Sequence, residues 1–216
     1  MELVKTIFNL QFASAIRPWL EIRDMLRVAG SGPGEIAANP VMLDQKEKRQ
    51  RVVLQVKAVG VELEPLDSSN QAATILELIT GMNEASEFPP VAEIRHTCLF
   101  IKPYSLPFHE LLSLVKDRFF RSNPLVEPAT DVGLLFDERE GEIFKHVQMG
   151  PMNTEQLQSQ YLTWAREAIP EVFLFVDLTY TRTREEPFAR ESVDELLRSA
   201  GDWQERQLRA VLQALD

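Results

Sequence analysis

Hydrophobic residues near the end of the chain first alternate with other side chains and then recur at helical spacing. Four apolar residues occupy every second position within the segment 171–182, a pattern typical of a buried β-strand. They are Val172, Leu174, Val176 and Leu178. After a charged turn, the capping box Ser192-x-x-Glu195 opens a run with apolar residues every three or four positions, which indicates an amphipathic helix. The sequence therefore predicts a core strand with a long helix packed over it.

Similar alternation predicts strands along the rest of the chain. These segments are 4–12, 41–43, 51–64, 91–102, 132–136 and 142–147. Within 51–64 the apolar residues move from even to odd positions near Gly60, so we expect a bulge or a sharp bend there. A charged turn at 45–49 and an acidic turn at 137–141 join neighbouring strands into hairpins.

Apolar residues at helical spacing, preceded by proline or by a capping residue, predict helices between these strands. One helix begins at Pro18, a second follows a capping box at Ser68, and a third begins at Pro107. A fourth is capped by Asn153 and carries apolar residues as far as Ile169. The order strand, helix, hairpin, helix therefore occurs twice before the final strand and helix.

The break Glu87-Phe88-Pro89-Pro90 separates these two runs of elements. We expect an N-terminal α+β half at 1–87 and a C-terminal α+β half at 91–216, either as two units or as one continuous domain. The predicted fold class is α+β, with a mainly antiparallel sheet, helices on one side, two pseudo-repeated β-α-β-β-α units and a C-terminal β-α pair. Few residues are identical between the two runs, so duplication and chance similarity both remain open.

Composition and charge narrow the classes of partner. The 216 residues are 44% hydrophobic and 26% charged, as in soluble globular proteins. With 23 basic and 33 acidic side chains the net charge is -10, which disfavours nucleic acid and anionic membranes as partners. The sequence shows no membrane span and no signal-peptide pattern, and Cys98 is the only cysteine. We therefore expect a cytoplasmic protein without disulfides.

His96 and Cys98 are the first candidates for chemistry, because they lie two residues apart on the same side of a predicted strand. With partners from elsewhere they could bind a metal ion or form a reactive thiolate pair. A thiol packed beside a histidine inside the sheet is the simpler interpretation. Ligand-spaced histidine pairs, calcium loops, Walker loops and serine nucleophile motifs do not occur in the sequence. We therefore expect no catalytic residues, no metal and no cofactor.

Asp177 interrupts the otherwise apolar final strand. A buried carboxylate must be paired or hydrogen-bonded, and Tyr180 and Arg182 are close enough in sequence to serve as partners. Asp177 is either part of a structural polar pair or one edge of a ligand cleft. The candidate polar anchors of a ligand site are therefore Asp177, His96, Cys98 and Tyr180.

The closing segment joins an apolar strand carrying an acidic residue, a charged turn to Pro187-Phe188, and the helix start Asp194-Glu195-Leu196-Leu197. Together with an early strand at 8–12, a strand and helix at 52–79 and a strand at 94–104, this order resembles a sporadically distributed, uncharacterised bacterial protein family of similar length. The resemblance implies a soluble bacterial accessory protein encoded beside mobile or antiviral-defence genes. It brings no catalytic residues.

These observations favour a non-enzymatic protein that binds another protein, as an accessory subunit of a bacterial assembly or as a homodimer. An acidic chain suits a basic partner. The alternative is a small-molecule-binding domain with a groove between the two halves, lined by aromatic residues. The expected lining residues are Trp19, Tyr104, Phe108, Tyr161 and Tyr180. An enzyme built on His96, Cys98 and Asp177 is the third hypothesis.

Overall fold

A computed structural model describes residues 1–17, 40–65, 70–120 and 123–215. The strands are β1 Glu2–Phe12, β2 Val41–Gln45, β3 Gln50–Gln55, β4 Ala58–Leu63, β5 Val91–Pro103, β6 Leu134–Glu140, β7 Ile143–Asn153 and β8 Val172–Glu186. The helices are η1 Lys46–Lys48, α3 Gln71–Ser86, α4 Phe108–Phe119, α5 Thr154–Gln160 and α6 Arg190–Leu215. The helix predicted from Pro18 and the cap predicted at Ser68 lie outside the described residues.

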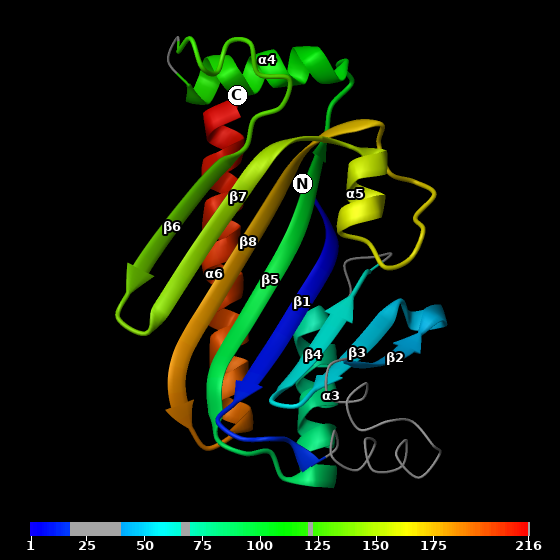
Figure 1. The fold of residues 1–216 in the computed structure, drawn as a ribbon, viewed down its shortest axis with the longest axis vertical. Coiled ribbons are helices and arrows are strands. Elements are labelled where there is room, and N and C mark those ends of the chain that lie inside the picture. Colours follow the sequence, from blue (N-terminus) through cyan, green and yellow to red (C-terminus); the bar gives the residue numbers. More distant parts are fainter. Residues whose placement is uncertain (18–39, 66–69, 121–122, 216) are drawn as a thin grey trace.

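The strands form one 8-stranded sheet in the order β2-β3-β4-β1-β5-β8-β7-β6, with β2 and β6 at its two edges (Figure 1). Every pairing is antiparallel, so the predicted α+β class with an antiparallel sheet is confirmed. β1 pairs with β5 across the predicted break at 87–90, and the two halves therefore share a single sheet. The two halves arrange their strands differently. In the N-terminal half, the first strand β1 lies directly beside the hairpin strand β4, whereas in the C-terminal half β8 lies between the first strand β5 and the hairpin strand β7.

The C-terminal strand and helix lie at the centre of this arrangement. β8 pairs with β5 on one side and with β7 on the other, and α6 runs along the back of the sheet (Figure 1). The main hydrophobic core fills the space between this face of the sheet and α3, α4 and α6, with Leu196, Ala200 and Trp203 buried on α6. The helix begins at Arg190, before the predicted cap at Ser192.

The opposite face of the sheet carries a second, smaller hydrophobic cluster at one end only. Leu157 of α5 packs there against Leu99, Phe173 and Phe175. Tyr161 lies over Phe175, with the ring centroids 4.6 Å apart. Thus α3, α4 and α6 share one side of the sheet, as predicted, and the short α5 lies on the other.

Helix α5 ends at Gln160, so the prediction that it continues to Ile169 was wrong. Its start is as predicted, because Asn153 forms a capping box with the third helical residue. Beyond Gln160, the main-chain N–H of Thr163 donates to the carboxylate of Glu64, which is 99 residues away in sequence. The helical pattern of hydrogen bonds already ends before this contact, because the N–H of Leu162 donates to the carbonyl oxygen of Leu157, five residues back. The bond to Glu64 then holds the segment that leaves the helix.

A buried ion cluster holds this segment against the sheet. The side chain of Glu64 is 1% exposed and accepts hydrogen bonds from Arg49 and from the main-chain N–H of Trp164. Lys5 lies 3.5 Å from Glu64 and donates to the carbonyl oxygen of Tyr161. Removing one partner from such a cluster leaves a buried charge uncompensated, which is strongly destabilising.

The segment 51–64 forms a hairpin and not the single bent strand that the sequence indicated. A tight turn at Val56 and Lys57 separates β3 from β4. Leu54 pairs with Val59, and cross-strand partners point to the same face. Even positions of β3 and odd positions of β4 therefore face the same core, which explains the change of parity near Gly60.

The hairpin of β6 and β7 has a shorter turn than predicted. Only Gly141 and Glu142 lie in the turn, and Gly141 has the positive φ of 59° that the sequence suggested. The acidic residues Asp137, Glu138 and Glu140 lie on β6 itself. In the described part of the chain, no helix combines the length and the apolar character needed to cross a bilayer.

Candidate functional site

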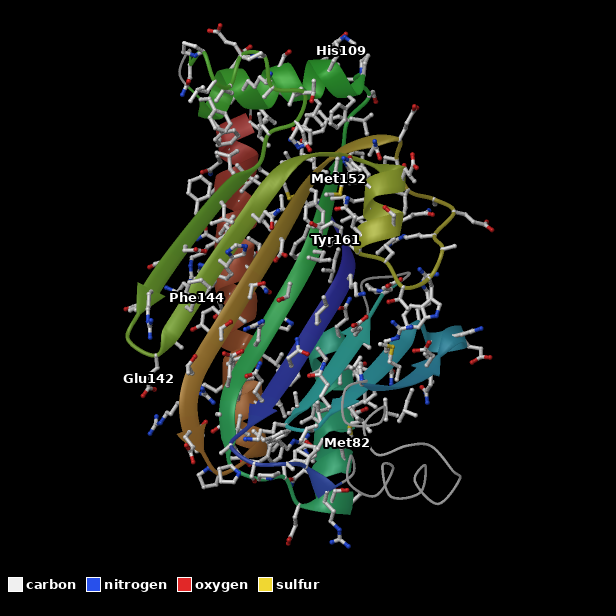
Figure 2. All side chains as sticks on the ribbon, viewed as in Figure 1. Met82, His109, Glu142, Phe144, Met152 and Tyr161 are labelled. Carbon is white, nitrogen blue, oxygen red and sulfur yellow. The ribbon has the colours of Figure 1, made fainter. Side chains whose placement is uncertain are left out.

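The part of this sheet face that no described helix covers carries a polar trough with a volume of about 620 Å³. Its lining side chains come from β1, β5, β6, β7, β8 and the β6–β7 turn, all on the face that carries the smaller cluster. Four of them are the threonines Thr97, Thr179, Thr181 and Thr183. Figure 2 labels Phe144 on β7, which lines the trough, and Glu142 at the hairpin tip.

Asp177 lies half-buried in this trough, near the middle of β8. The hydroxyl of Thr179 donates to its Oδ1 at 3.1 Å, and Thr179 Oγ1 lies 2.7 Å from Thr97 Oγ1. Burial raises the pKa of Asp177, while the hydrogen bond from Thr179 and the nearby His146 lower it. Among the described residues, no lysine or arginine forms an ion pair with this carboxylate.

Three other charged or titratable side chains of the trough, Glu93, Arg95 and His146, have a charged partner among the described residues. Arg95 contacts Glu93 at 2.8 Å. His146 Nδ1 lies 2.6 Å from Asp137 Oδ1, and because a carboxylate only accepts, we assign the proton of this hydrogen bond to Nδ1. Arg139, at the β6 side, forms no ion pair with the described residues. The trough therefore presents mixed charges, with Asp177 as its unpaired carboxylate in the floor.

The remaining predicted candidates lie on the other side of the sheet, inside the main core. His96, Cys98 and Tyr180 are all buried there. Cys98 Sγ lies 3.7 Å from His96 Nε2. On the other side of the imidazole, Gln204 of α6 lies 3.4 Å from Nδ1 and donates to the carbonyl oxygen of Leu178 at 3.1 Å. The structure therefore brings these candidates together with one another but separates them from the trough.

Burial also decides the protonation of these core residues. It lowers the pKa of His96 to about 4 and raises the pKa of Cys98 to about 12. At neutral pH the imidazole is uncharged and the thiol keeps its proton. A buried, protonated thiol is a poor nucleophile, so this cluster has the character of a packed polar group.

The expected aromatic-lined groove does not form in the described residues. Tyr161 packs in the smaller cluster, whereas Tyr104, Phe108 and Tyr180 pack in or against the main core on the other face. Trp19 lies outside the described residues. The sheet itself separates these rings, because successive side chains of a strand point to opposite faces.

Strand β6 borders the trough and forms an exposed edge of the sheet. Its neighbouring residues Leu135 and Phe136 point to opposite faces and are 60% and 53% exposed. No described strand pairs with the outer side of β6. The other edge, β2, also exposes Met42 and Leu43 but has 5 residues against 7 in β6. Exposed apolar residues on an unprotected edge are typical of interaction surfaces.

Two features of this surface were missed from the sequence. Thr179, Thr181 and Thr183 occur at every second position after Asp177, and such a polar series in a strand indicates a solvated face. Leu135 and Phe136 are adjacent, so one of them had to lie on the face away from the core. Neither signal identifies a ligand.

The described residues contain no group of three or more His, Cys, Asp and Glu side chains that could hold a metal ion. Comparison with known proteins adds no assignment, since neither a protein-family model nor a curated protein matches the chain. The trough around Asp177 and the edge of β6 are therefore the two surfaces of the described residues with features suited to binding.

Proposed function

We propose that this is a non-catalytic interaction protein, which binds an extended basic segment of a partner protein as an additional strand beside β6. The observation that carries the proposal is the uncovered edge of β6, on which Leu135 and Phe136 are more than half exposed. A strand that adds to such an edge gains main-chain hydrogen bonds for affinity and side-chain contacts for specificity.

The hairpin geometry indicates which main-chain groups the partner would use. In an antiparallel pair, residues alternate between positions that bond to the neighbouring strand and positions whose N–H and C=O point away. The turn at 141–142 is closed by the pair Glu140 and Ile143, which is hydrogen-bonded in a two-residue hairpin turn. The bonded residues of β6 are therefore Glu140, Glu138 and Phe136, which bond to β7. The residues between them, Leu135, Asp137 and Arg139, point their N–H and C=O groups outward.

The side chains of β6 favour a basic partner. Glu138 and Glu140 are 62% and 77% exposed and share one cation, Lys145. The whole chain has a net charge of -10, which favours association with basic proteins. Pairing β6 with β6 of a second copy across its acidic half would place like charges opposite each other, which weakens strand pairing.

The proposal can be tested with a phage-displayed library of random peptides selected on the immobilised protein. We expect enriched peptides in which apolar residues alternate with lysine or arginine. Asp137→Pro removes one outward-pointing N–H without removing a bond between β6 and β7, and should weaken peptide binding about tenfold. Asp137→Asn is the matched control, because it removes the same charge but keeps the N–H, and should bind more tightly than Asp137→Pro.

Two results would contradict the proposal. One is a selection that enriches no peptide, or peptides that bind wild type and the folded Asp137→Pro variant equally well. The other is a dimer in sedimentation experiments that Asp137→Pro abolishes, since a second copy would then occupy the edge. Circular dichroism of both variants verifies that the sheet has formed.

The wider role that we propose is that of a cytoplasmic accessory subunit of a bacterial assembly, with a part in antiviral defence. The support is the family resemblance of the closing segment, together with the buried thiol of Cys98 as the only cysteine of the chain. Co-purification with the products of neighbouring genes tests this role. Retention of those products by wild type and by Asp137→Pro alike would count against binding through β6.

A further inference from the structure

We propose that the floor of the trough around Asp177 binds an organic cation that carries N–H donors, a primary ammonium or a guanidinium group. The residues concerned belong to β5 and β8, and β7 separates β8 from the β6 edge. The site therefore goes beyond the proposed strand addition and does not depend on it.

The hydrogen bonds among Asp177, Thr179 and Thr97 leave unused acceptors, and no unused donor, on these three side chains. Thr179 donates its hydroxyl proton to Asp177 Oδ1. The bond of 2.7 Å between the two threonine hydroxyls must then be donated by Thr97, because Thr179 has no second proton to give. What remains is acceptor capacity on the Asp177 carboxylate and on Thr97 Oγ1. A negatively charged group of acceptors is complementary to a cation with several N–H donors.

No lysine or arginine of the described residues forms an ion pair with Asp177. Arg139 also lines the trough and has no ion pair among the described residues, but it lies on β6, and β7 separates that strand from β8. Within the described residues Arg95 is paired with Glu93, and His146 is paired with Asp137. Burial raises the pKa of Asp177 by more than the hydrogen bond from Thr179 and the nearby His146 lower it, as expected for a carboxylate that has lost part of its hydration and has no ion-paired lysine or arginine among the described residues. Such a charge gains more from a bound cation than a fully hydrated one would.

The space above the floor suits a small molecule or one side chain. The trough has a volume of about 620 Å³, within the usual range for small-ligand sites. Ile7 and Phe144 line it and offer apolar contact for the carbon chain of an amine, and an aromatic face also attracts cations. Metal binding is less suited to this place, because a single carboxylate with hydroxyls provides few strong ligands.

Titrations of the nitrogen-15-labelled protein at constant ionic strength test the site. Putrescine supplies ammonium groups, agmatine supplies a guanidinium group, and tetramethylammonium is the control with positive charge but no N–H donor. We expect saturable shifts of the amide signals of Thr97, Asp177 and Thr179 with the first two compounds and not with the third. A lysine-containing peptide with acetylated and amidated ends is titrated in the same way. Shifts with this peptide alone would support the cation site and show that the bound cation is a side chain of a polypeptide.

Variants locate the binding. Asp177→Asn keeps an oxygen for Thr179 but removes the charge, and should weaken putrescine binding about tenfold or more. Thr97→Val removes one acceptor and should have a smaller effect in the same direction. Glu77→Gln, which removes an exposed charge of α3 on the other face of the sheet, is the matched control and should change the affinity by no more than about twofold.

Three results would overturn the inference: no shifts in the floor with any compound, equal shifts with tetramethylammonium, or unchanged affinity in both Asp177→Asn and Thr97→Val. Asp177→Asn should leave the capture of peptides by β6 unchanged. The cation site and the proposed strand addition can therefore fail independently.

Discussion

Replacing His96 by asparagine should make the stability of the protein much less sensitive to acid. His96 is 7% exposed, and burial lowers its pKa to about 4 from an ordinary value of 6.5. The amide nitrogen of Gln204 donates to the carbonyl oxygen of Leu178 and faces His96 Nδ1, so we assign Nδ1 as an acceptor and place the imidazole proton on Nε2. Protonation of Nδ1 would bring two donors face to face.

The sign and size of the effect follow from the two pKa values. Because the unfolded chain keeps the ordinary pKa, it binds more protons than the folded protein between about pH 4 and pH 6.5. The free energy of unfolding is therefore complete above this window and falls as the pH falls through it. At about 1.4 kcal/mol per pKa unit, His96 alone should lower the free energy of unfolding by about 2 kcal/mol between pH 7 and pH 5.

Urea denaturation of wild type and His96→Asn at several pH values in this range measures the effect. Acidic residues such as Asp177 contribute to both curves, so their contributions cancel in the difference. From pH 7 to pH 5, the free energy of unfolding of wild type should fall by about 2 kcal/mol more than that of His96→Asn. A pH-independent loss of stability caused by the substitution does not affect this comparison. His109 projects from α4 into solvent (Figure 2), and His109→Asn should leave the wild-type pH dependence unchanged. Parallel curves for wild type and His96→Asn would refute the argument.

Cys98 should react with a thiol reagent only after unfolding, because burial raises its pKa to about 12 and blocks access; rapid labelling of the native protein would contradict this. Glu64→Gln should lower the free energy of unfolding by about 3 kcal/mol, since its cationic partners lose a buried carboxylate; a loss below about 1 kcal/mol in urea denaturation would show that the ion cluster contributes little. Gly150→Ala should destabilise by about 2 kcal/mol, because the added Cβ would lie 2.7 Å from the Val132 carbonyl oxygen. Gly201→Ala, with nothing within 4 Å, should instead stabilise α6 by about 1 kcal/mol, and thermal unfolding of the two variants should show opposite shifts.

Local features of the fold were predictable because short-range physics produces them. The alternation of apolar residues in 171–182 predicted β8, and the capping box at Asn153 predicted the start of α5. The positive φ of Gly141 followed from its place in a hairpin turn. Each of these depends on neighbours a few residues away, so each is visible in one stretch of sequence.

The candidate site was predictable only in part. Asp177 stood out as a carboxylate in an apolar strand, and the structure places it in the trough. His96 and Cys98 stood out equally, yet both lie in the main core. Alternation shows which residues of one strand share a face, but it does not say which face the helices will cover.

The sequence by itself therefore determined the approximate position of most described strands and helices, the antiparallel α+β class and the central role of the last strand and helix. Only the tertiary structure decided that β8 lies between β5 and β7, that α5 stops at Gln160, and that no described strand pairs with the outer side of β6. The physical reason is that these outcomes depend on partners distant in the chain. Just beyond the end of α5, Glu64 accepts the N–H of Thr163, which is 99 residues away in sequence, and no local pattern contains that contact.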